Sequence, residues 1–383
     1  MIVRLAARGD GVTADGRFVP MTAPGDTVAS DGTVTPGPHR AMPPCRHFPE
    51  CGGCQLQHVD DAAFADYLTD RIAAALAAQG LSGIEIRAPH LSPPQSRRRA
   101  ALKARGGAVG FNALASHSIV DMRECHVLRP ELFALIAPLR RLLDQPATAQ
   151  LTLADQGVDL LLEGFSAEGL EKAEAIGAFA RDHGLARLAI GDGYGAQTLW
   201  EPEPATVTLG GVAVPLPHGA FLQATADGEA ALVAAVREAV GAAGAIADLF
   251  AGLGTFALAL PGRVYAAEGA RDAALALQGA ANRTQRPVFV DHRDLFRRPL
   301  DVAELDRFEA VVLDPPRAGA KEQAALLAAS AVPRIAYVSC NPATFARDAR
   351  TLAEGGYRLG WIKPVGQFRW STHVELVGCL VRG

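Results

Sequence analysis

The sequence predicts an α/β protein whose C-terminal part is a doubly wound, Rossmann-like domain. After residue 216, apolar strand-like runs alternate with helical patterns. One such run ends in the glycine turn Gly252-Leu253-Gly254, and another ends abruptly in Ser339-Cys340-Asn341-Pro342. We divide the chain into a short N-terminal β unit (1–40), a central α+β domain (41–215) and the Rossmann-like domain (216–383).

Composition bounds the class of protein. The chain has 383 residues, 49% hydrophobic and 20% charged, so it is globular and long enough for about two or three domains. Its net charge of −4 disfavours non-specific coating of nucleic acid, so contact with RNA requires a local basic face. Six cysteines are too few for a disulfide scaffold of this length. Early charges and the lack of an apolar stretch of roughly 18 residues predict a cytoplasmic protein without a membrane segment.

The N-terminal 40 residues alternate short β-like pieces with Gly/Asp turns at 9–11, 14–16 and 30–32. This pattern predicts a small antiparallel unit of three or four strands, of the kind that forms an incomplete barrel. The alternative is a simple N-terminal extension. A Pro/Gly-rich linker follows at 35–44.

Three cysteines, Cys45, Cys51 and Cys54, lie within ten residues of sequence, and Cys125 follows later. Glycines between two of them let the backbone fold so that several sulfurs converge. Four thiolates suit zinc or an iron–sulfur cluster. The spacing departs from paired Cys-x-x-Cys hooks and favours a cluster, with a zinc site as the alternative.

The central domain mixes helices and strands. Residues 91–105 form the most basic segment of the chain, where a strand would expose alternate Arg side chains to phosphate; the alternative is a solvated run of charge. We expect helices at 62–79, at 131–143 with a kink or break at Pro138, and at 171–183. We expect strands at 150–153, 158–162, 187–190 and 206–209.

The Rossmann-like domain is predicted from six strands and the helices between them. The strands are expected at 245–250, 263–267, 288–291, 310–314, 335–338 and 374–381, the last as an antiparallel partner. The helices are expected at 227–240, directly after Gly254, at 271–282 and at 343–353.

Polar residues at the strand ends indicate chemistry, because open α/β sheets bind ligands at the carboxyl ends of their strands. Cys340 ends one strand and is a candidate nucleophile if its pKa is lowered; the alternative is an inert, buried thiol. Glu268 ends the second strand, where it can accept hydrogen bonds from a ribose. Asp314-Pro-Pro ends the fourth and favours S-adenosylmethionine over a nicotinamide cofactor.

From Cys45 onward, the chain resembles the RNA uracil-C5 methyltransferases, in particular their bacterial iron–sulfur 23S rRNA members. The motifs that carry this resemblance are the four cysteines, Phe221-Leu-Gln223, Asp248-Leu-Phe-Ala-Gly-Leu-Gly254, Asp314-Pro-Pro-Arg317, Ser339-Cys340-Asn341-Pro342 and His373-Val-Glu375-Leu-Val. The family commonly reads Phe-x-Gln-x-Asn where this chain has Thr225 as the last residue.

The resemblance implies roles for individual residues. Cys340 is the nucleophile that adds to uracil C6, and Glu375 is the base that removes the C5 proton. Apart from the resemblance, we hypothesise on electrostatic grounds that Arg317 stabilises the O4 enolate or holds the base, with a phosphate contact as the alternative. Cofactor contacts are implied at Gln223, Phe250, Thr255, Glu268, Asp294 and Asp314. A 4Fe–4S cluster is implied on Cys45, Cys51, Cys54 and Cys125, with a structural role.

The function implied is a SAM-dependent RNA methyltransferase that makes 5-methyluridine, with 23S rRNA favoured over tRNA as substrate. The N-terminal unit resembles a shortened form of the RNA-binding β-barrel of some members. We expect a monomer. The alternatives are a non-catalytic, cluster-bearing RNA-binding protein and, third, a nicotinamide oxidoreductase.

Overall fold

The computed structural model describes residues 1–191, 193 and 195–383, and the chain divides into two compact units. Unit 1 consists of Met1–Leu68, Leu91–Pro204 and Phe368–Thr372; unit 2 consists of Thr69–His90, Ala205–Gln367 and His373–Gly383. The helix α1 (Asp61–Ala78) begins in unit 1 and ends in unit 2. Each unit therefore combines segments that are distant in the sequence. The division into three domains stays a prediction.

Unit 1 begins with small antiparallel strands, as the Gly/Asp turns predict. The strands β1 (Ile2–Leu5), β2 (Gly11–Thr13) and β3 (Phe18–Val19) form one sheet, and β4 (Thr27–Val28) pairs with β5 (Val34–Thr35). Gly9, Gly16 and Gly32 at the three predicted turns have positive φ, which favours glycine over residues with a Cβ.

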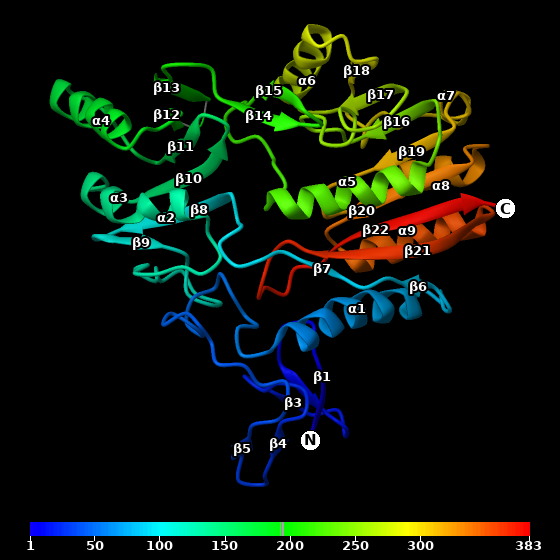
Figure 1. Cartoon of the computed structure of the whole chain (residues 1–383), viewed down its shortest axis with the longest axis horizontal. Coiled ribbons are helices and arrows are strands. Elements are labelled where there is room, and N and C mark those ends of the chain that lie inside the picture. Colours follow the sequence, from blue (N-terminus) through cyan, green and yellow to red (C-terminus); the bar gives the residue numbers. More distant parts are fainter. Residues whose placement is uncertain (192, 194) are drawn as a thin grey trace. The chain divides into compact units, whose positions relative to one another are not determined.

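A six-stranded sheet in the order β13-β12-β11-β10-β8-β9 forms the rest of unit 1 (Figure 1). Its strands are β8 (Arg99–Arg105), β9 (Ala108–Gly110), β10 (Ala147–Ala154), β11 (Gly157–Glu163), β12 (Arg187–Gly191) and β13 (Ala196–Trp200). The accompanying helices are α2 (Pro130–Ala134), α3 (Ile136–Leu142) and α4 (Leu170–Asp182).

Two sequence expectations in unit 1 are tested by these elements. In β8, Ala100, Leu102 and Ala104 are buried while Lys103 and Arg105 are exposed, so the basic segment does present charge on one face of a strand. The break between α2 and α3 falls at Leu135, not at Pro138. Pro138 lies in the first turn of α3, where an amide N–H has no helical partner and its absence costs little.

Unit 2 is built on a nine-stranded sheet with the main order β18-β17-β16-β19-β20-β22-β21-β6. The strands are β16 (Ala245–Leu249), β17 (Arg263–Glu268), β18 (Val288–His292), β19 (Ala310–Leu313), β20 (Arg334–Ser339), β21 (Tyr357–Gly366), β22 (Glu375–Arg382) and β6 (Glu85–Ile86), with β7 (His90–Leu91) off this path. A separate hairpin consists of β14 (Thr206–Leu209) and β15 (Val212–Pro215).

The five strands from β18 to β20 are parallel, and β22 runs antiparallel to β20, as expected for the last strand. After β16, the chain adds strands first on one side and then, from β19, on the other. The boundary between β16 and β19 is therefore the topological switch point, where ligands bind in open α/β sheets. The doubly wound architecture is confirmed.

Helices cover this sheet because its central strands are apolar throughout. All four residues of β19 are buried, as in parallel strands covered on both faces. The helices are α5 (Ala226–Val240), α6 (Arg271–Arg283), α7 (Val302–Leu305), α8 (Lys321–Ala329) and α9 (Pro342–Glu354). Both α5 and α9 pack against β20 (Figure 1).

The helix expected directly after Gly254 is wrong, because residues 251–260 form consecutive turns. The amide of Ala257 donates to the Asp248 carboxylate at 2.8 Å and is not used in a helical ladder. Pro261 closes the segment after few residues, which leaves too little chain for a regular helix.

Among the described residues, no helix combines the length and the apolar character needed to span a membrane.

Candidate active site and metal centre

Cys340 lies in a tight turn between β20 and α9, at the carboxyl edge of the sheet in unit 2. The amide of Asn341 donates to the Ser339 hydroxyl at 3.1 Å, and the Asn341 side chain caps α9 by accepting from Ala343 N at 3.1 Å. Pro342 occupies the first helical position, where its fixed φ suits a helix start. The turn holds the thiol half-buried, so it is not sealed in the core.

Glu375 is the first residue of β22, the strand that pairs with β20. The antiparallel register of β20 and β22 pairs Ser339 with Leu376, so its continuation by one residue sets Cys340 opposite Glu375. Glu375 is 8% exposed. Residues 340 and 375 are distant in sequence, but the sheet register alone brings them together.

Burial and neighbouring charge control the ionisation of both groups. Burial, followed by the charge of Asp314, raises the pKa of Glu375 to about 8. Burial, followed by the charges of Glu375 and Asp314, raises the pKa of Cys340 to about 11, and Arg317 opposes this shift. A cation bound beside these groups would favour both the thiolate and the carboxylate.

The loop that carries Asp314 and Arg317 is tied to the cysteine turn. The side-chain nitrogen Nδ2 of Asn341 donates to the Arg317 backbone carbonyl at 3.1 Å, and the Thr344 hydroxyl donates to the same oxygen at 3.3 Å. The Arg317 side chain is exposed. The two strand-end loops therefore form one hydrogen-bonded edge with a cation available at its surface.

The glycine turn after β16 lies at the switch point. Phe250 adopts a φ of 66° and Gly252 a φ of 56°. A Cβ built on Gly252 would meet no atom within 4 Å, so the backbone there faces open space. The Glu268 carboxylate accepts from Gly252 N at 2.7 Å and from Ala270 N at 2.6 Å. Glu268 therefore fixes the turn that a nucleoside would approach.

The donor set at this edge fits a cationic nucleoside. Oδ1 of the fully buried Asp248 has no hydrogen-bond partner among the described residues. Burial, with the charges of Asp314 and Glu268, raises the pKa of Asp248 to about 8. Burial and Glu268 raise the pKa of Asp314 to about 7. The carboxylates of Asp248, Glu268 and Asp314 repel one another when they are ionised. A bound cation such as the sulfonium of S-adenosylmethionine would reduce this repulsion.

The remaining predicted cofactor residues are found around the same sheet edge or on nearby loops. Gln223 is buried, and its Oε1 accepts from Gln367 Nε2 at 2.8 Å. Thr225, where the family commonly has Asn, caps α5 by accepting from Gly228 N at 3.1 Å. Thr255 is half-buried within the glycine turn, and the exposed Asp294 accepts from Phe296 N at 3.0 Å.

Sequence reasoning missed two residues of this region. Phe296 places its ring 5.4 Å from that of Phe250, and an isolated Phe in a polar loop gives no sequence signal. Gln367 contacts the Gln223 side chain directly. It stands alone between a strand and a loop, so no spacing or motif marks it.

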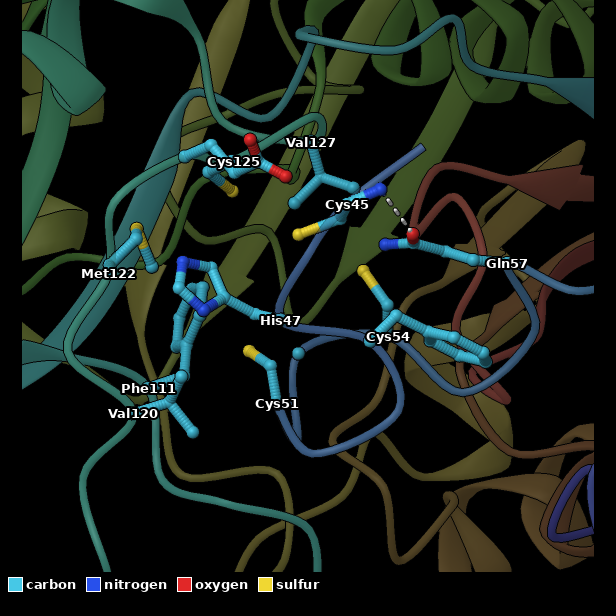
Figure 2. A pocket seen from close by; sticks show the side chains of 13 residues that line it. Cys45, His47, Cys51, Cys54, Gln57, Phe111, Val120, Met122, Cys125 and Val127 are labelled. Carbon is cyan, nitrogen blue, oxygen red and sulfur yellow. Dashed lines mark hydrogen bonds between the residues drawn. The ribbon is translucent and has the colours of Figure 1, made fainter. Parts of the chain in front are cut away.

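Unit 1 holds the four cysteines around one cavity. Figure 2 shows the side chains of Cys45, Cys51, Cys54 and Cys125 lining it together with Phe111 and other residues. A Cβ on Gly52 would lie 2.8 Å from the Asn112 carbonyl oxygen, so only glycine permits this close approach of the cysteine loop. Among the described residues, no group of three or more His, Cys, Asp or Glu is arranged to hold a single metal ion.

The cavity thiols strongly disfavour negative charge unless something compensates it. Burial, with the charges of the other three cysteines, raises the pKa of Cys54 to about 12. Arg97 lies close enough to Cys125 to lower the pKa of that thiol, although burial raises it overall. The Arg97 guanidinium also lies 5.6 Å from the Phe111 ring centre. The His47 Nε2 faces the Arg123 amide at 2.9 Å, consistent with a bystander.

Known proteins are similar to this chain in sequence and in fold. A family model described as tRNA (uracil-5-)-methyltransferase matches residues 216–382. An RNA methyltransferase of Zymomonas mobilis is 55% identical over 100% of this chain and 99% of its own length. The 23S rRNA (uracil(1939)-C(5))-methyltransferase RlmD of Chromohalobacter salexigens is 32% identical over 100% of this chain and 88% of its length. The Pyrococcus abyssi tRNA (uracil-54, C5)-methyltransferase, solved with S-adenosyl-L-homocysteine, matches with a TM-score of 0.73 and 23% identity over 99% of both chains.

The doubly wound sheet and the carboxyl-lined switch point define an S-adenosylmethionine-dependent RNA methyltransferase. Within that class, the chain belongs to the RNA uracil-C5 methyltransferase family. The predicted enzyme class is confirmed over both the nicotinamide oxidoreductase and the non-catalytic RNA-binding protein. The roles of individual site residues stay predictions.

Proposed function

We propose that the protein methylates C5 of one uridine in 23S rRNA through a covalent adduct between Cys340 and uracil C6. The observation that carries this proposal is the pairing of a half-buried cysteine with a buried carboxyl group, Glu375, across two strands beside the cofactor edge. A thiol and a base on opposite strands suit one addition and one proton removal on the same ring.

The proposed reaction runs in three balanced steps. The Cys340 thiolate adds to C6, which forms the Sγ–C6 bond and makes C5 an enolate carbon. S-adenosylmethionine supplies the methyl group, which C5 accepts with release of S-adenosylhomocysteine. Glu375 then takes the C5 proton, and the electron pair left behind restores the ring double bond and expels the thiolate. The uracil base must leave its stack to reach this depth.

Charge at the site suits this order of events. Arg317 opposes the rise in the pKa of Cys340 and is the nearby cation that can favour the thiolate or the developing O4 charge. In our proposal, Gln223, Phe250, Thr255, Glu268, Asp294 and Asp314 hold the cofactor. Its positive charge offsets the carboxyl groups of Asp248 and Asp314, both of which have raised pKa values.

We assign the cavity of unit 1 to a 4Fe–4S cluster held by Cys45, Cys51, Cys54 and Cys125. Four thiols line one cavity without the convergence that a single ion requires, and zinc binds sulfur at about 2.3 Å. A cluster is larger, so its ligands stand farther apart. Arg97, half-buried beside Cys125 and Cys54, complements the negative charge of a thiolate-bound cluster. The cluster has a structural role in this proposal.

The choice of 23S rRNA rests on the relative named for that substrate, which aligns with the whole chain at 32% identity. The family model and the similar solved structure carry tRNA names, so tRNA is the second candidate. The N-terminal strands are proposed to contact RNA, in a monomeric, cytoplasmic enzyme. Mapping 5-methyluridine in RNA from a deletion strain separates the substrates: loss of one rRNA site supports the proposal, and loss of a tRNA site overturns it.

The covalent mechanism is tested with Glu375→Gln. In this variant the Cys340 thiolate can still add to C6 and uracil C5 can still accept the methyl group, but the C5 proton cannot be removed. We therefore expect a methylated RNA–protein adduct that survives denaturing electrophoresis. Glu354→Gln is the matched control, because Glu354 is an exposed residue paired with Arg350 and should release product normally. An active Glu375→Gln enzyme that accumulates no adduct would assign the base to another residue.

A further inference from the structure

Gln367 follows directly after β21 and is 2% exposed, although it is a polar residue in no predicted motif. Its Oε1 accepts from the Ala224 amide at 2.9 Å, and its Nε2 donates to Gln223 Oε1 at 2.8 Å. The Ala224 amide can only donate, so it fixes which end of the Gln367 side chain is oxygen. The amide nitrogen therefore faces the side-chain oxygens around it.

The same side chain lies beside Glu375. The strands β21 and β22 pair Val365 with Glu375, and Gln367 follows Val365 by two residues, so Gln367 and Glu375 are diagonal neighbours within reach of each other. Burial, followed by the charge of Asp314, raises the pKa of Glu375, and the neighbouring Gln367 side chain opposes this rise. Nε2 of Gln367 carries two hydrogens, so beside the one donated to Gln223 a second is available to the Glu375 carboxylate. One buried side chain joins the segment before α5 to the first residue of β22.

Close packing keeps Gln367 in this place. A Cβ on Gly228 would lie 2.7 Å from Gln367 Cβ and 2.6 Å from Thr225 Oγ1, so the first turn of α5 admits Gln367 only because residue 228 is glycine. The side chain has little freedom to turn away from its partners. A fixed amide of this kind is preorganised to orient the groups that it contacts.

We propose that Gln367 is a positioning residue that orients the catalytic base Glu375 relative to the cofactor-side residue Gln223. This inference rests on the proposed roles of Glu375 and Gln223. Gln367 touches neither reacting atom: it acts by donating one hydrogen bond to the base and one to the cofactor side. It thereby couples cofactor binding to the removal of the C5 proton.

The test uses the full-length protein with Gln367→Met, which keeps side-chain length and volume but removes the amide. Single-turnover reactions with RNA labelled with tritium at uridine C5 report proton removal, and labelled S-adenosylmethionine reports methyl transfer. We expect the rise of proton removal with pH to move about one unit higher, because the ionised base loses a hydrogen bond. Near pH 7, proton removal should fall about tenfold and covalent adduct should accumulate.

A second effect is expected on the cofactor. Loss of the bond to Gln223 should raise the KM for S-adenosylmethionine about fivefold. Gln367→Glu keeps the acceptor for Ala224 but sets a second carboxylate beside Glu375, so it should move the pH profile farther than Gln367→Met. This second variant keeps the test decisive if one replacement folds poorly.

The matched control is Gln323→Met. Gln323 is also 2% exposed and also accepts from and donates to backbone groups, those of Leu300, but it lies in α8 away from the base. It should lose stability without any shift in the pH profile. If both Gln367 variants fold and match wild type in pH profile and adduct level, the positioning role is refuted. If wild type itself forms no adduct and releases no tritium, the proposed function fails instead.

Discussion

Both units hold buried or half-buried thiols with a candidate function, four in unit 1 and Cys340 in unit 2, but different groups surround them. In unit 1, the cavity sulfurs lie near one another, and the cation Arg97 lies beside those of Cys125 and Cys54. In unit 2, Cys340 faces the carboxyl groups of Glu375 and Asp314, with Arg317 at the surface. Several neighbouring thiols can bind one metal centre together. A single thiol beside a basic group can instead add to a substrate and be eliminated from it. The neighbours of a cysteine, more than its own burial, indicate its chemistry.

The largest effect is expected for Cys340→Ala, which removes the sulfur that faces carboxyl groups. Methylation and covalent RNA trapping should fall to background, while S-adenosylmethionine still binds in calorimetry, because no cofactor contact is lost. Cys379→Ala is the matched control, since Cys379 is buried in β22 opposite Ala336 and serves packing. Full activity of Cys340→Ala would show that Cys340 is not the nucleophile.

Cys54→Ser tests the other side of the comparison. Anaerobically purified wild type should contain iron and sulfide and absorb in the iron–sulfur region, and the variant should lose both because one of four thiolates is missing. Unit 1 should then exchange its amide hydrogens faster, whereas Cys379→Ser should retain the iron. Bound zinc without iron–sulfur absorbance in wild type would reject the cluster and revive the zinc alternative.

The units should also differ in how pH affects their stability. In unit 2 the pKa of Asp248 is raised to about 8, so between pH 4 and 8 the folded state keeps a proton that the unfolded state has released. Stability therefore falls as pH rises through that window, by a few kcal/mol at most, and Asp248→Asn should flatten the decline. Urea unfolding of cofactor-free protein from pH 5 to 8 measures it.

In unit 1, Asp121 has the opposite effect on stability as pH changes. Hydrogen bonds and Arg140 lower the pKa of Asp121, so its contribution is present above pH 4 and is lost only in stronger acid. Hydrogen exchange of peptides from each unit separates the two trends. A parallel response of both units, or an unchanged slope in Asp248→Asn, would contradict the assignment of a buried, protonated Asp248.

The smallest effect concerns the cap of α5. Thr225→Ala removes the hydroxyl that accepts from Gly228 N and should destabilise unit 2 by about 1 kcal/mol in urea unfolding. Thr225→Asn restores both a capping side chain and the residue common in the family, so it should match wild type. A loss as large in Thr225→Asn would show that the hydroxyl has a role beyond capping.

Sequence reasoning predicted best where local signals agreed. The runs that end at Glu268, Asp314 and Cys340 are apolar strands closed by glycine or proline, and the structure confirms these strands. Local pattern could not reveal β21, because Lys363 and Pro364 interrupt its apolar run and its pairing with β22 decides its conformation. The helix expected after Gly254 failed because the Asp248 carboxylate takes the Ala257 amide.

The candidate site shows the same limit. Cys340 and Asp314 were predicted from their positions at strand ends, and the family resemblance supplied Glu375 and Gln223. Nothing in a linear pattern sets residue 340 opposite residue 375, because antiparallel register is a tertiary property. Gln367 was missed for the same reason: its partners at 223, 224 and 375 are joined only in the folded protein.

The pairing of β6 with β21 has a consequence for biosynthesis. Glu85 meets Trp361 in this pair, so one edge of the unit 2 sheet is translated roughly 275 residues before its partner. At bacterial elongation rates of about 5–20 residues per second, that early segment waits tens of seconds on the ribosome. During synthesis, β6 therefore remains without its sheet partner until β21 emerges.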